Sequence, residues 1–331
     1  MIELAGRAAD LERYGVDAGL LAELAAVGLL AVAGPAELGG LDAPGQRAVS
    51  EHLAGQSPDA WFVWFQHGPV VRALTTTDNA ELRDRHLADL CAGRAQGGVA
   101  WSNLRTARPS VRASRVDGGW RLDGPQPWCT GWPLLDLVLV GGMVGEPSAG
   151  QVVFGVVPLP DPGLVSTGRL ELAAMAGTST HAVRYDGLVL RDDQVTAVRP
   201  FADWRADDRA GNADAQPSTF GVALAALDLL APDQPAVADA LREQVLAVRE
   251  QAYRLRDEVP RGELLAERLL LRAQALELGI RCSTALLAAR GGRGMGADDP
   301  AQRLLRAAAF QVVHSQDADV RTSTLRLLRA G

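Results

Sequence analysis

The spacing of hydrophobic residues along the chain changes twice, and each change predicts a change of secondary structure. Over residues 10–93, apolar side chains recur three or four positions apart, as Leu20 and Leu24 do. This period places them on one face of an α-helix. Short breaks occur at residues 34–35, Gly-Pro, and 39–40, Gly-Gly, which are sequences that end helices. The first part of the chain is therefore predicted to be helical.

The pattern is different between residues 97 and 198. Short runs rich in Val and Leu are separated there by Gly, Pro and Asp, which is typical of β-strands joined by turns. The clearest runs are residues 120–124, 137–140, 152–157 and 182–190. The middle of the chain is therefore predicted to be a β domain.

Helical spacing returns after residue 203. Apolar residues over 241–255 predict one long helix, and a second is expected from residue 263 to about 289, with Gly291 and Gly292 as its cap. A last helix is expected over residues 304–313, and its continuation through Leu328 is left open. Helices, then strands, then helices indicate an α+β chain and not an alternating α/β one. The predicted domains are residues 1–96, 97–202 and 203–331.

The composition excludes several classes of function. The formal net charge is -7, and all 33 basic residues are arginines because the sequence contains no lysine. Without lysine there is no Schiff base, so covalent pyridoxal phosphate chemistry and the lysine of a P-loop are both excluded. The arginines are scattered and form no basic stripe, which argues against nucleic acid as a partner.

The cysteines, the histidines and the hydropathy predict a protein of the cytoplasm without a metal site. Cys91, Cys129 and Cys282 are odd in number and widely spaced, which fits neither a disulfide framework nor a metal cluster. The histidines also lack the spacing of metal ligands. No N-terminal signal and no apolar run long enough to span a bilayer is visible, so no membrane partner is expected.

Five short segments occur in an order that points to one family. They are GLL with PAELGG at residues 28–40, WRLDGPQPWCT at 120–130, MAGTSTHAVRYDGLVL at 175–190, GGRGM at 291–295 and RLLRA at 303–307. Each segment alone is weak evidence. In this order, over nearly the whole chain, they resemble motifs of the acyl-CoA dehydrogenase superfamily.

The resemblance implies a fold, a cofactor and partners. It implies an N-terminal helical domain, a central β-barrel or sandwich domain and a C-terminal helical bundle, with FAD held between the last two. It also implies an acyl group bound to CoA or to a carrier protein as substrate, electron-transfer flavoprotein or a flavin reductase as redox partner, and a homodimer or homotetramer. The implied flavin contacts are Trp101, Ser102, Asn103, Trp128, Cys129, Thr130, Gly291 and Gly292.

The sequence departs from the family pattern at the expected catalytic base. Setting Arg306 on the arginine of the family's "RDa" motif brings residues 314–317, His-Ser-Gln-Asp, onto the segment whose glutamate is the base in many members. Ser315 then occupies the position of the base. A serine hydroxyl is a poor proton acceptor at neutral pH, so this route of dehydrogenation would lose its base.

Three other residues are candidates for acid–base chemistry. His314 titrates near neutral pH and is the best of them, and Asp317 lies on the same segment. Asp214, with Asp208 nearby, lies close to the helix on which some family members carry the base. The alternatives are a surface or interface role for His314 and a loop or helix-start role for the aspartates.

The motif that binds the flavin diphosphate in the family is also missing from this sequence. The helix after Gly221 is shortened, and no arginine–phenylalanine pair follows it. Arg249, Arg254 or Arg290 are possible substitutes, since guanidinium groups suit phosphate. Weak retention of FAD is therefore expected.

Three functions remain open on these grounds. The first is a flavoprotein oxidoreductase of the acyl-CoA dehydrogenase type. The second is a monooxygenase on the same fold, which uses reduced flavin and needs no glutamate base. The third is a scaffold or binding protein that has kept the fold and lost the flavin.

Overall fold

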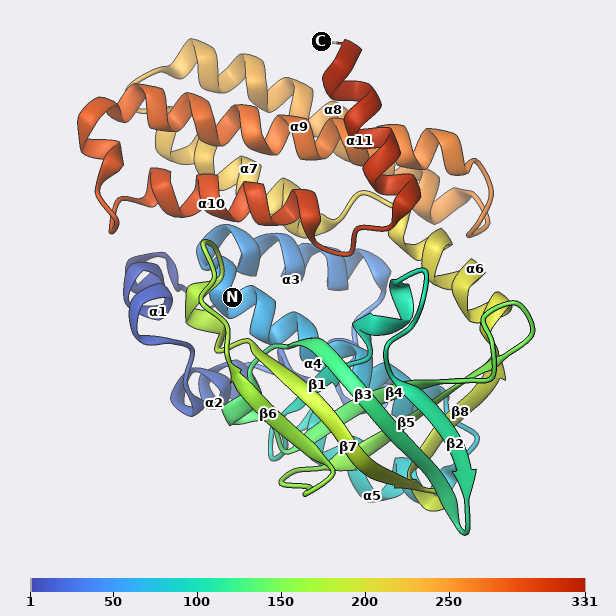
Figure 1. The fold of residues 1–331 in the computed structure, drawn as a ribbon. Helices are drawn as coiled ribbons and strands as arrows, with labels where there is room; N and C mark the ends of the chain where they lie inside the picture. Colours follow the sequence, from blue (N-terminus) through green and yellow to red (C-terminus); the bar gives the residue numbers. More distant parts are fainter. Residues whose placement is uncertain (1, 331) are drawn as a thin grey trace.

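Helices, then strands, then helices follow one another along the chain, as the hydrophobic pattern predicts (Figure 1). The computed structural model describes residues 2–330. The N-terminal helices are α1 (Ala8–Tyr14), α2 (Ala18–Ala26), α3 (Ala43–Gln56), α4 (Pro58–Thr76) and α5 (Ala80–Cys91). The strands are β1 (Gly97–Ala100), β2 (Arg112–Val116), β3 (Gly119–Cys129), β4 (Leu137–Val144), β5 (Gln151–Pro158), β6 (Leu164–Arg169), β7 (His181–Arg191) and β8 (Val195–Pro200). The C-terminal helices are α6 (Phe201–Asn212), α7 (Pro217–Leu230), α8 (Pro235–Glu258), α9 (Leu265–Arg290), α10 (Pro300–Val313) and α11 (Ala318–Ala330).

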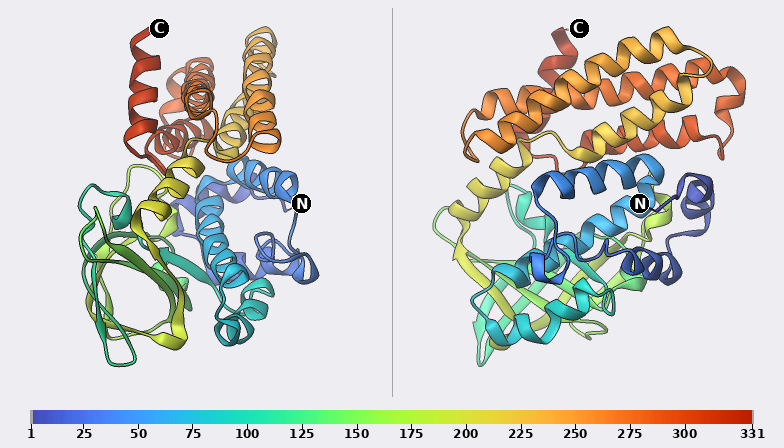
Figure 2. Two further views of the ribbon diagram at one scale, coloured as in Figure 1. Left: turned by 90° about the vertical axis from the view of Figure 1, so that its right-hand side faces the viewer. Right: turned by 180° about the vertical axis from the view of Figure 1, so that it is seen from behind.

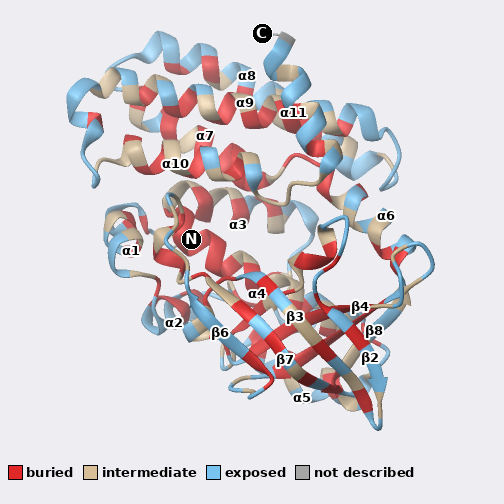
Figure 3. Ribbon diagram, viewed as in Figure 1, coloured by how far each residue is buried: buried red, intermediate tan, exposed pale blue. Residues whose placement is uncertain are grey.

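Helix α4 is buried along most of its length and joins the three groups of elements (Figure 3). Its start is fixed by Ser57, whose side chain accepts a hydrogen bond from the backbone N–H of Ala60 at 3.3 Å, and by Pro58 in the first turn. The helix contacts β1 on one side and α3 on another. Phe62 of α4 also packs against Phe310 of α10, with 4.7 Å between the ring centroids, so α4 faces both the sheet and the C-terminal helices.

The strands form one strongly curled sheet (Figure 2). Their order is β6-β7-β3-β2-β4-β5-β8, and β1 pairs with β4 in parallel. The central strands β4 and β5 are buried on both faces, which explains their continuous apolar sequence. Gly141 allows this close packing, because a Cβ atom there would lie 2.8 Å from the ring of Phe154.

The C-terminal helices form a bundle around α9, which packs against α7, α8, α10 and α11. The long helix predicted for residues 263–289 is confirmed, and Gly291 ends it with a φ of +57°. Continuation of the last helix through Leu328 is wrong. The chain leaves the helix at His314, Ser315 has a φ of +50°, and Asp317 caps α11 by accepting from the backbone N–H of Val320 at 2.9 Å.

The three-part order of the predicted α+β fold is confirmed, with helices ending before Gly97 and returning at Phe201. The division into domains at residues 96 and 202 stays a prediction. Among residues 2–330, no helix combines the length and the apolar character needed to cross a bilayer. In the same part of the chain, no group of three His, Cys, Asp or Glu side chains is placed to hold a metal ion.

Asp59 links α4 to the turn at Ala176–Thr178 and is almost completely buried. Its Oδ1 accepts a hydrogen bond from the N–H of Gly177 at 2.8 Å. Desolvation raises the pKa of this carboxyl from 3.8 to about 6, although the Gly177 bond acts in the opposite direction. The folded state therefore holds this proton more tightly than the unfolded chain does, and the free energy of unfolding falls as pH rises from 3.8 to about 6.

We predict that Asp59→Asn removes this fall, because an amide still offers an oxygen to Gly177 and does not ionise. Near pH 8 the variant should be more stable than the wild type by about 1 to 3 kcal/mol, measured by urea unfolding across the acidic and neutral range. Asp186→Asn, at an exposed position on β7, is the control. An unchanged pH profile in Asp59→Asn would contradict the assignment.

Candidate functional site

A deep cleft of about 1710 Å³ lies where the three groups of elements meet. Its walls come from α3 and α4, from the ends of β1 and β3, from α6, and from the segments that join α8 to α9 and α10 to α11. Small-molecule pockets usually measure roughly 300 to 1,000 Å³. The cleft is therefore large enough for a cofactor together with a substrate.

The sheet contributes a wall of aromatic and hydroxyl side chains. Trp101 follows β1, and its buried Nε1 has no hydrogen-bond partner among residues 2–330. The guanidinium of Arg105 lies 4.9 Å from its ring centroid. Trp128 is 49% exposed and lines the cleft, together with Ser102 and Thr130. Four of the predicted flavin contacts are therefore brought together on one wall.

Two neighbours of these residues do not face the cleft. Asn103 is fully buried, and its Oδ1 accepts from the N–H of Val111 at 3.2 Å, so its side chain stabilises the turn. Cys129 lies in the interior of the sheet, where burial raises the pKa of its thiol to about 12. The side chains alternate in direction along an extended strand, which explains why Cys129 points away from the cleft while Trp128 and Thr130 line it.

The predicted contacts Gly291 and Gly292 lie outside the cleft as well. They follow the last residue of α9, at the end opposite the α8–α9 connection that borders the cleft (Figure 1). Within one chain they do not meet the other predicted contacts. Their role toward a cofactor stays a prediction.

Three threonine hydroxyls form a chain of hydrogen bonds, which decides where the hydroxyl of Thr130 donates its proton. Thr178 Oγ1 donates to the carbonyl of Met175 at 2.7 Å, so the 2.8 Å contact between Thr178 and Thr180 is made by the proton of Thr180. The remaining proton, that of Thr130, then lies in its 3.0 Å contact with Thr180. Thr130 consequently presents free lone pairs, and not a proton, to the cleft.

His314 lies in the cleft wall inside a box of aromatic rings. Its ring stacks on Phe310 at 5.2 Å and meets the rings of Trp61, Phe62 and Phe65 edge-on at 5.3–5.5 Å. Its Nδ1 is buried and finds no hydrogen-bond partner in the described part of the chain. Desolvation, followed by the charges of Arg272 and Arg105, lowers the pKa of His314 to about 3. The ring lines the cleft, but it is a weak proton acceptor at neutral pH.

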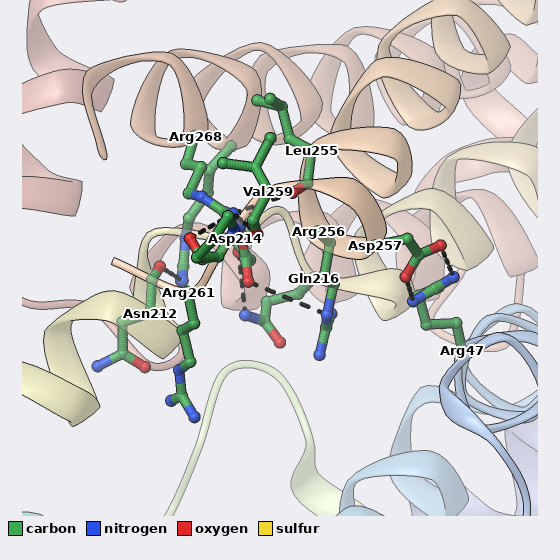
Figure 4. A network of polar contacts seen from close by, with 12 residues as sticks. Arg47, Asn212, Asp214, Gln216, Leu255, Arg256, Asp257, Val259, Arg261 and Arg268 are labelled. Carbon is green, nitrogen blue, oxygen red and sulfur yellow. Dashed lines mark hydrogen bonds and ion pairs between the residues drawn. The ribbon is translucent and has the colours of Figure 1, made fainter. Parts of the chain in front are cut away.

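The aspartates that line the cleft are engaged in structural contacts. Asp214 Oδ1 accepts from Nη1 of the buried Arg268 at 2.5 Å (Figure 4). Asp317 caps α11. Each of the other two is held by one guanidinium: Asp208 receives three hydrogen bonds from Arg105, and Asp257 receives two from Arg47. No carboxylate among the lining residues is left without a partner.

Arginines are the part of the site that the sequence did not reveal. Ten of them line the cleft: Arg47, Arg72, Arg105, Arg199, Arg205, Arg256, Arg261, Arg268, Arg306 and Arg321. The suggested substitutes lie elsewhere, and Arg249 is paired with Glu51 at 2.9 Å. No local signal could have found the cluster, because its members are scattered between residues 47 and 321.

Comparisons with known proteins define the class of fold. No family model matches the sequence. A segment of 135 residues, 39% of this chain, is 22% identical to the mitochondrial 2-methylacyl-CoA dehydrogenase of Solanum tuberosum. It covers 33% of that protein, so the match spans about a third of the length of this curated relative.

Solved structures match over almost the whole chain. A probable acyl-CoA dehydrogenase from Mycobacterium abscessus superposes with a TM-score of 0.84 at 18% identity, covering 99% of this chain and 95% of the other. The nitrososynthase of Micromonospora carbonacea var. africana gives 0.79 at 20% identity, with 98% and 92% covered. PigA in its FAD complex gives 0.80 at 16%, with 96% and 90% covered. The chain therefore has the acyl-CoA dehydrogenase fold, and the resemblance seen in the sequence is confirmed.

We predict that Arg268→Met lowers the free energy of unfolding by about 3 to 5 kcal/mol, because it leaves Asp214 buried and without its closest partner. Chemical denaturation followed by circular dichroism measures this. Arg281→Met on the same helix is the control, since its pair with Glu277 is exposed and should contribute less than about 1 kcal/mol. Equal losses in both variants would show that Asp214 is not held as described.

We also predict that the His314 ring stays neutral at mildly acidic pH. Nuclear magnetic resonance of ring-labelled histidine, with His314→Phe to assign the signal, should show no protonation of this ring until the pH approaches 3. The lowered pKa means that the unfolded chain takes up this proton first, so protonation favours unfolding in acid. A midpoint near 6.5 would restore His314 as a candidate base.

Proposed function

We propose that the chain is a flavin-dependent oxidoreductase with FAD bound between the sheet wall and the C-terminal helices. The indoles of Trp101 and Trp128 suit a planar ring, and Thr130 offers an acceptor at its edge. The orphaned, buried Nε1 of Trp101 and the arginine-rich lining fit a polar, anionic cofactor. PigA, which has the same fold, has been solved with FAD.

Every carboxylate that lines the cleft is engaged in a structural contact. This observation decides which type of reaction we propose. Acyl-CoA dehydrogenation needs a base for the α-proton while the flavin accepts the β-hydride. Ser315 cannot serve, His314 has a pKa of about 3, and Asp214 is held by Arg268. Ordinary dehydrogenation is therefore the less favoured of the two enzymatic functions.

The function that the geometry supports best is a monooxygenase that uses reduced flavin. Reduced flavin and O₂ together supply one oxygen atom to the substrate and one to water, and the flavin ends oxidised. This chemistry requires no carboxylate base from the C-terminal segment. The acceptor that Thr130 presents matches the N–H that reduced flavin carries at N5 and that oxidised flavin lacks.

The residues of the chain then act by binding, by orientation and by excluding water. Trp101 and Trp128 hold a ring in place, Thr130 fixes its edge, and the aromatic rings around His314 exclude water from the part of the cleft that they line. A flavin reductase is the proposed redox partner. An acyl group carried by CoA or by a carrier protein remains the proposed substrate, and a homo-oligomer the proposed assembly.

We predict that the protein binds reduced FAD about tenfold more tightly than oxidised FAD, which corresponds to one hydrogen bond. Anaerobic titration followed by tryptophan fluorescence measures both affinities. Thr130→Val should remove the preference, and Thr130→Ser should restore it. If an acyl-CoA bleaches the bound flavin in the absence of oxygen, the proposal is wrong and the dehydrogenase function is supported. If neither reduced nor oxidised FAD binds, the scaffold function remains.

The Ser315→Glu variant tests whether the missing base is the only obstacle to dehydrogenation or whether other parts of the site have changed as well. The substitution supplies only a proton acceptor, and the motif that binds the flavin diphosphate in the family is still missing, so a carboxylate at this position should not be enough for dehydrogenation. The variant is expected to bind flavin and still fail to dehydrogenate any acyl-CoA.

A further inference from the structure

The turn at Ala176–Thr178, which is joined to Thr130 by hydrogen bonds, has an unusual backbone at both of its ends. Met175 and Ser179 flank it, and both have a positive φ, +59° and +47°. Residues with a Cβ atom adopt this left-handed conformation at a cost in free energy, and they keep it only where neighbouring groups enforce it. The contacts that hold the turn therefore decide its conformation.

Three hydrogen bonds from other parts of the chain hold the turn. The carboxylate of Asp59 on α4 accepts from the N–H of Gly177 at 2.8 Å, and Asp59 is only 1% exposed. The carbonyl of Gly177 accepts from the N–H of Val16 at 2.9 Å, and the carbonyl of Thr178 accepts from the N–H of Gly131 at 2.9 Å. Two of the three are bonds between backbone groups. The bond to Asp59 is the one that a substitution can remove.

The turn directs the hydroxyl of Thr130 through two other threonines. Thr178 donates its proton to the carbonyl of Met175 at 2.7 Å, so its oxygen accepts from Thr180 at 2.8 Å. Thr180 then accepts the proton of Thr130 at 3.0 Å. The first of these bonds depends on the conformation of the turn, because its donor and its acceptor belong to the turn or its ends. If the turn relaxes, the direction of all three protons is no longer fixed.

We propose that Asp59 is a positioning residue for Thr130, which holds the turn at Gly177 and thereby fixes the direction in which Thr130 donates its proton. Asp59 is not among the residues that line the cleft, whereas Thr130 is. Asp59 therefore acts through the turn and the threonines, and not by touching a ligand. Its consequence for flavin rests on the proposed function, but the direction of the Thr130 hydroxyl can be measured without flavin.

Nuclear magnetic resonance of the full chain with labelled threonine methyl groups tests the first step in the absence of flavin. The Thr130 methyl group, assigned with Thr130→Val, should show a single χ1 rotamer in the wild type. Asp59→Leu keeps the branched shape of aspartate and removes the acceptor, so the Thr130 side chain should average between rotamers. Asp59→Asn should restore the single rotamer, because an amide still offers an oxygen to Gly177. Asp59→Ala replaces Asp59→Leu if leucine does not fit, since it removes the acceptor as well.

The second step is measured as the ratio of the affinities for reduced and oxidised FAD. The tenfold preference expected of the wild type should fall to about one in Asp59→Leu and return in Asp59→Asn. When Thr130→Val is already present, Asp59→Leu should not change the ratio further, because its effect passes through Thr130. Ser218→Ala is the control for stability, since it removes a buried 3.0 Å hydrogen bond to Gln311 in the bundle and should leave the ratio unchanged.

Thr178→Val changes the same path between Asp59 and Thr130. Without the Thr178 hydroxyl, Thr180 loses its acceptor and donates to Thr130 instead, which frees the proton of Thr130 to point into the cleft. Oxidised flavin has a lone pair at N5, where reduced flavin carries an N–H. This variant is therefore expected to bind oxidised FAD more tightly than reduced FAD, which is the reverse of the wild type.

A single Thr130 rotamer in the variant without the acceptor at position 59 would overturn the proposal. An affinity ratio that stays at the wild-type value in both Asp59→Leu and Thr178→Val would overturn it too. If the wild type shows no preference between the two forms of FAD while Asp59→Leu still frees the Thr130 side chain, the proposed function is wrong and the positioning role of Asp59 is supported.

Discussion

Two buried arginines on α9, one helical turn apart, hold the polar side of the cleft in place. Arg268 donates to Asp214 and to carbonyls at the α8–α9 connection, and Arg272 donates to the carbonyls of Asn212 and His314. Both are at most 2% exposed. Chain segments without regular structure leave carbonyl groups unpaired, and buried carbonyl groups need donors. The connections that shape the site therefore depend on these two guanidinium groups.

This arrangement also decides the electrostatics of the cleft. The carboxylates that line it hold helices and turns in place, while several lining arginines have no carboxylate partner within residues 2–330. Acid–base chemistry by a carboxylate is thereby disfavoured, and binding of anions is favoured. Arginine keeps its charge even when it is partly desolvated, so this preference holds across the neutral pH range.

The fold and the chemistry of this chain depend on different features of the sequence. The fold needs apolar faces of the right period and glycines where backbones approach closely, and these occur throughout the chain. The chemistry depends on a few side chains, such as the residue at position 315. A site can therefore change while the fold remains that of the acyl-CoA dehydrogenases, which is why similar folds serve different reactions.

The sequence by itself determined the order of helices and strands, the long helix that ends at Gly291, and the presence of Ser315 where the family has a glutamate. These features are encoded locally, by hydrophobic period, by helix capping and by the order of motifs. Only the tertiary structure decided that the chain breaks after α10, that Cys129 faces inward and that Asp214 is held by Arg268. It alone brought ten arginines, scattered along the chain, to the lining of one cleft. Each of these outcomes depends on partners far away along the chain, which no local pattern specifies.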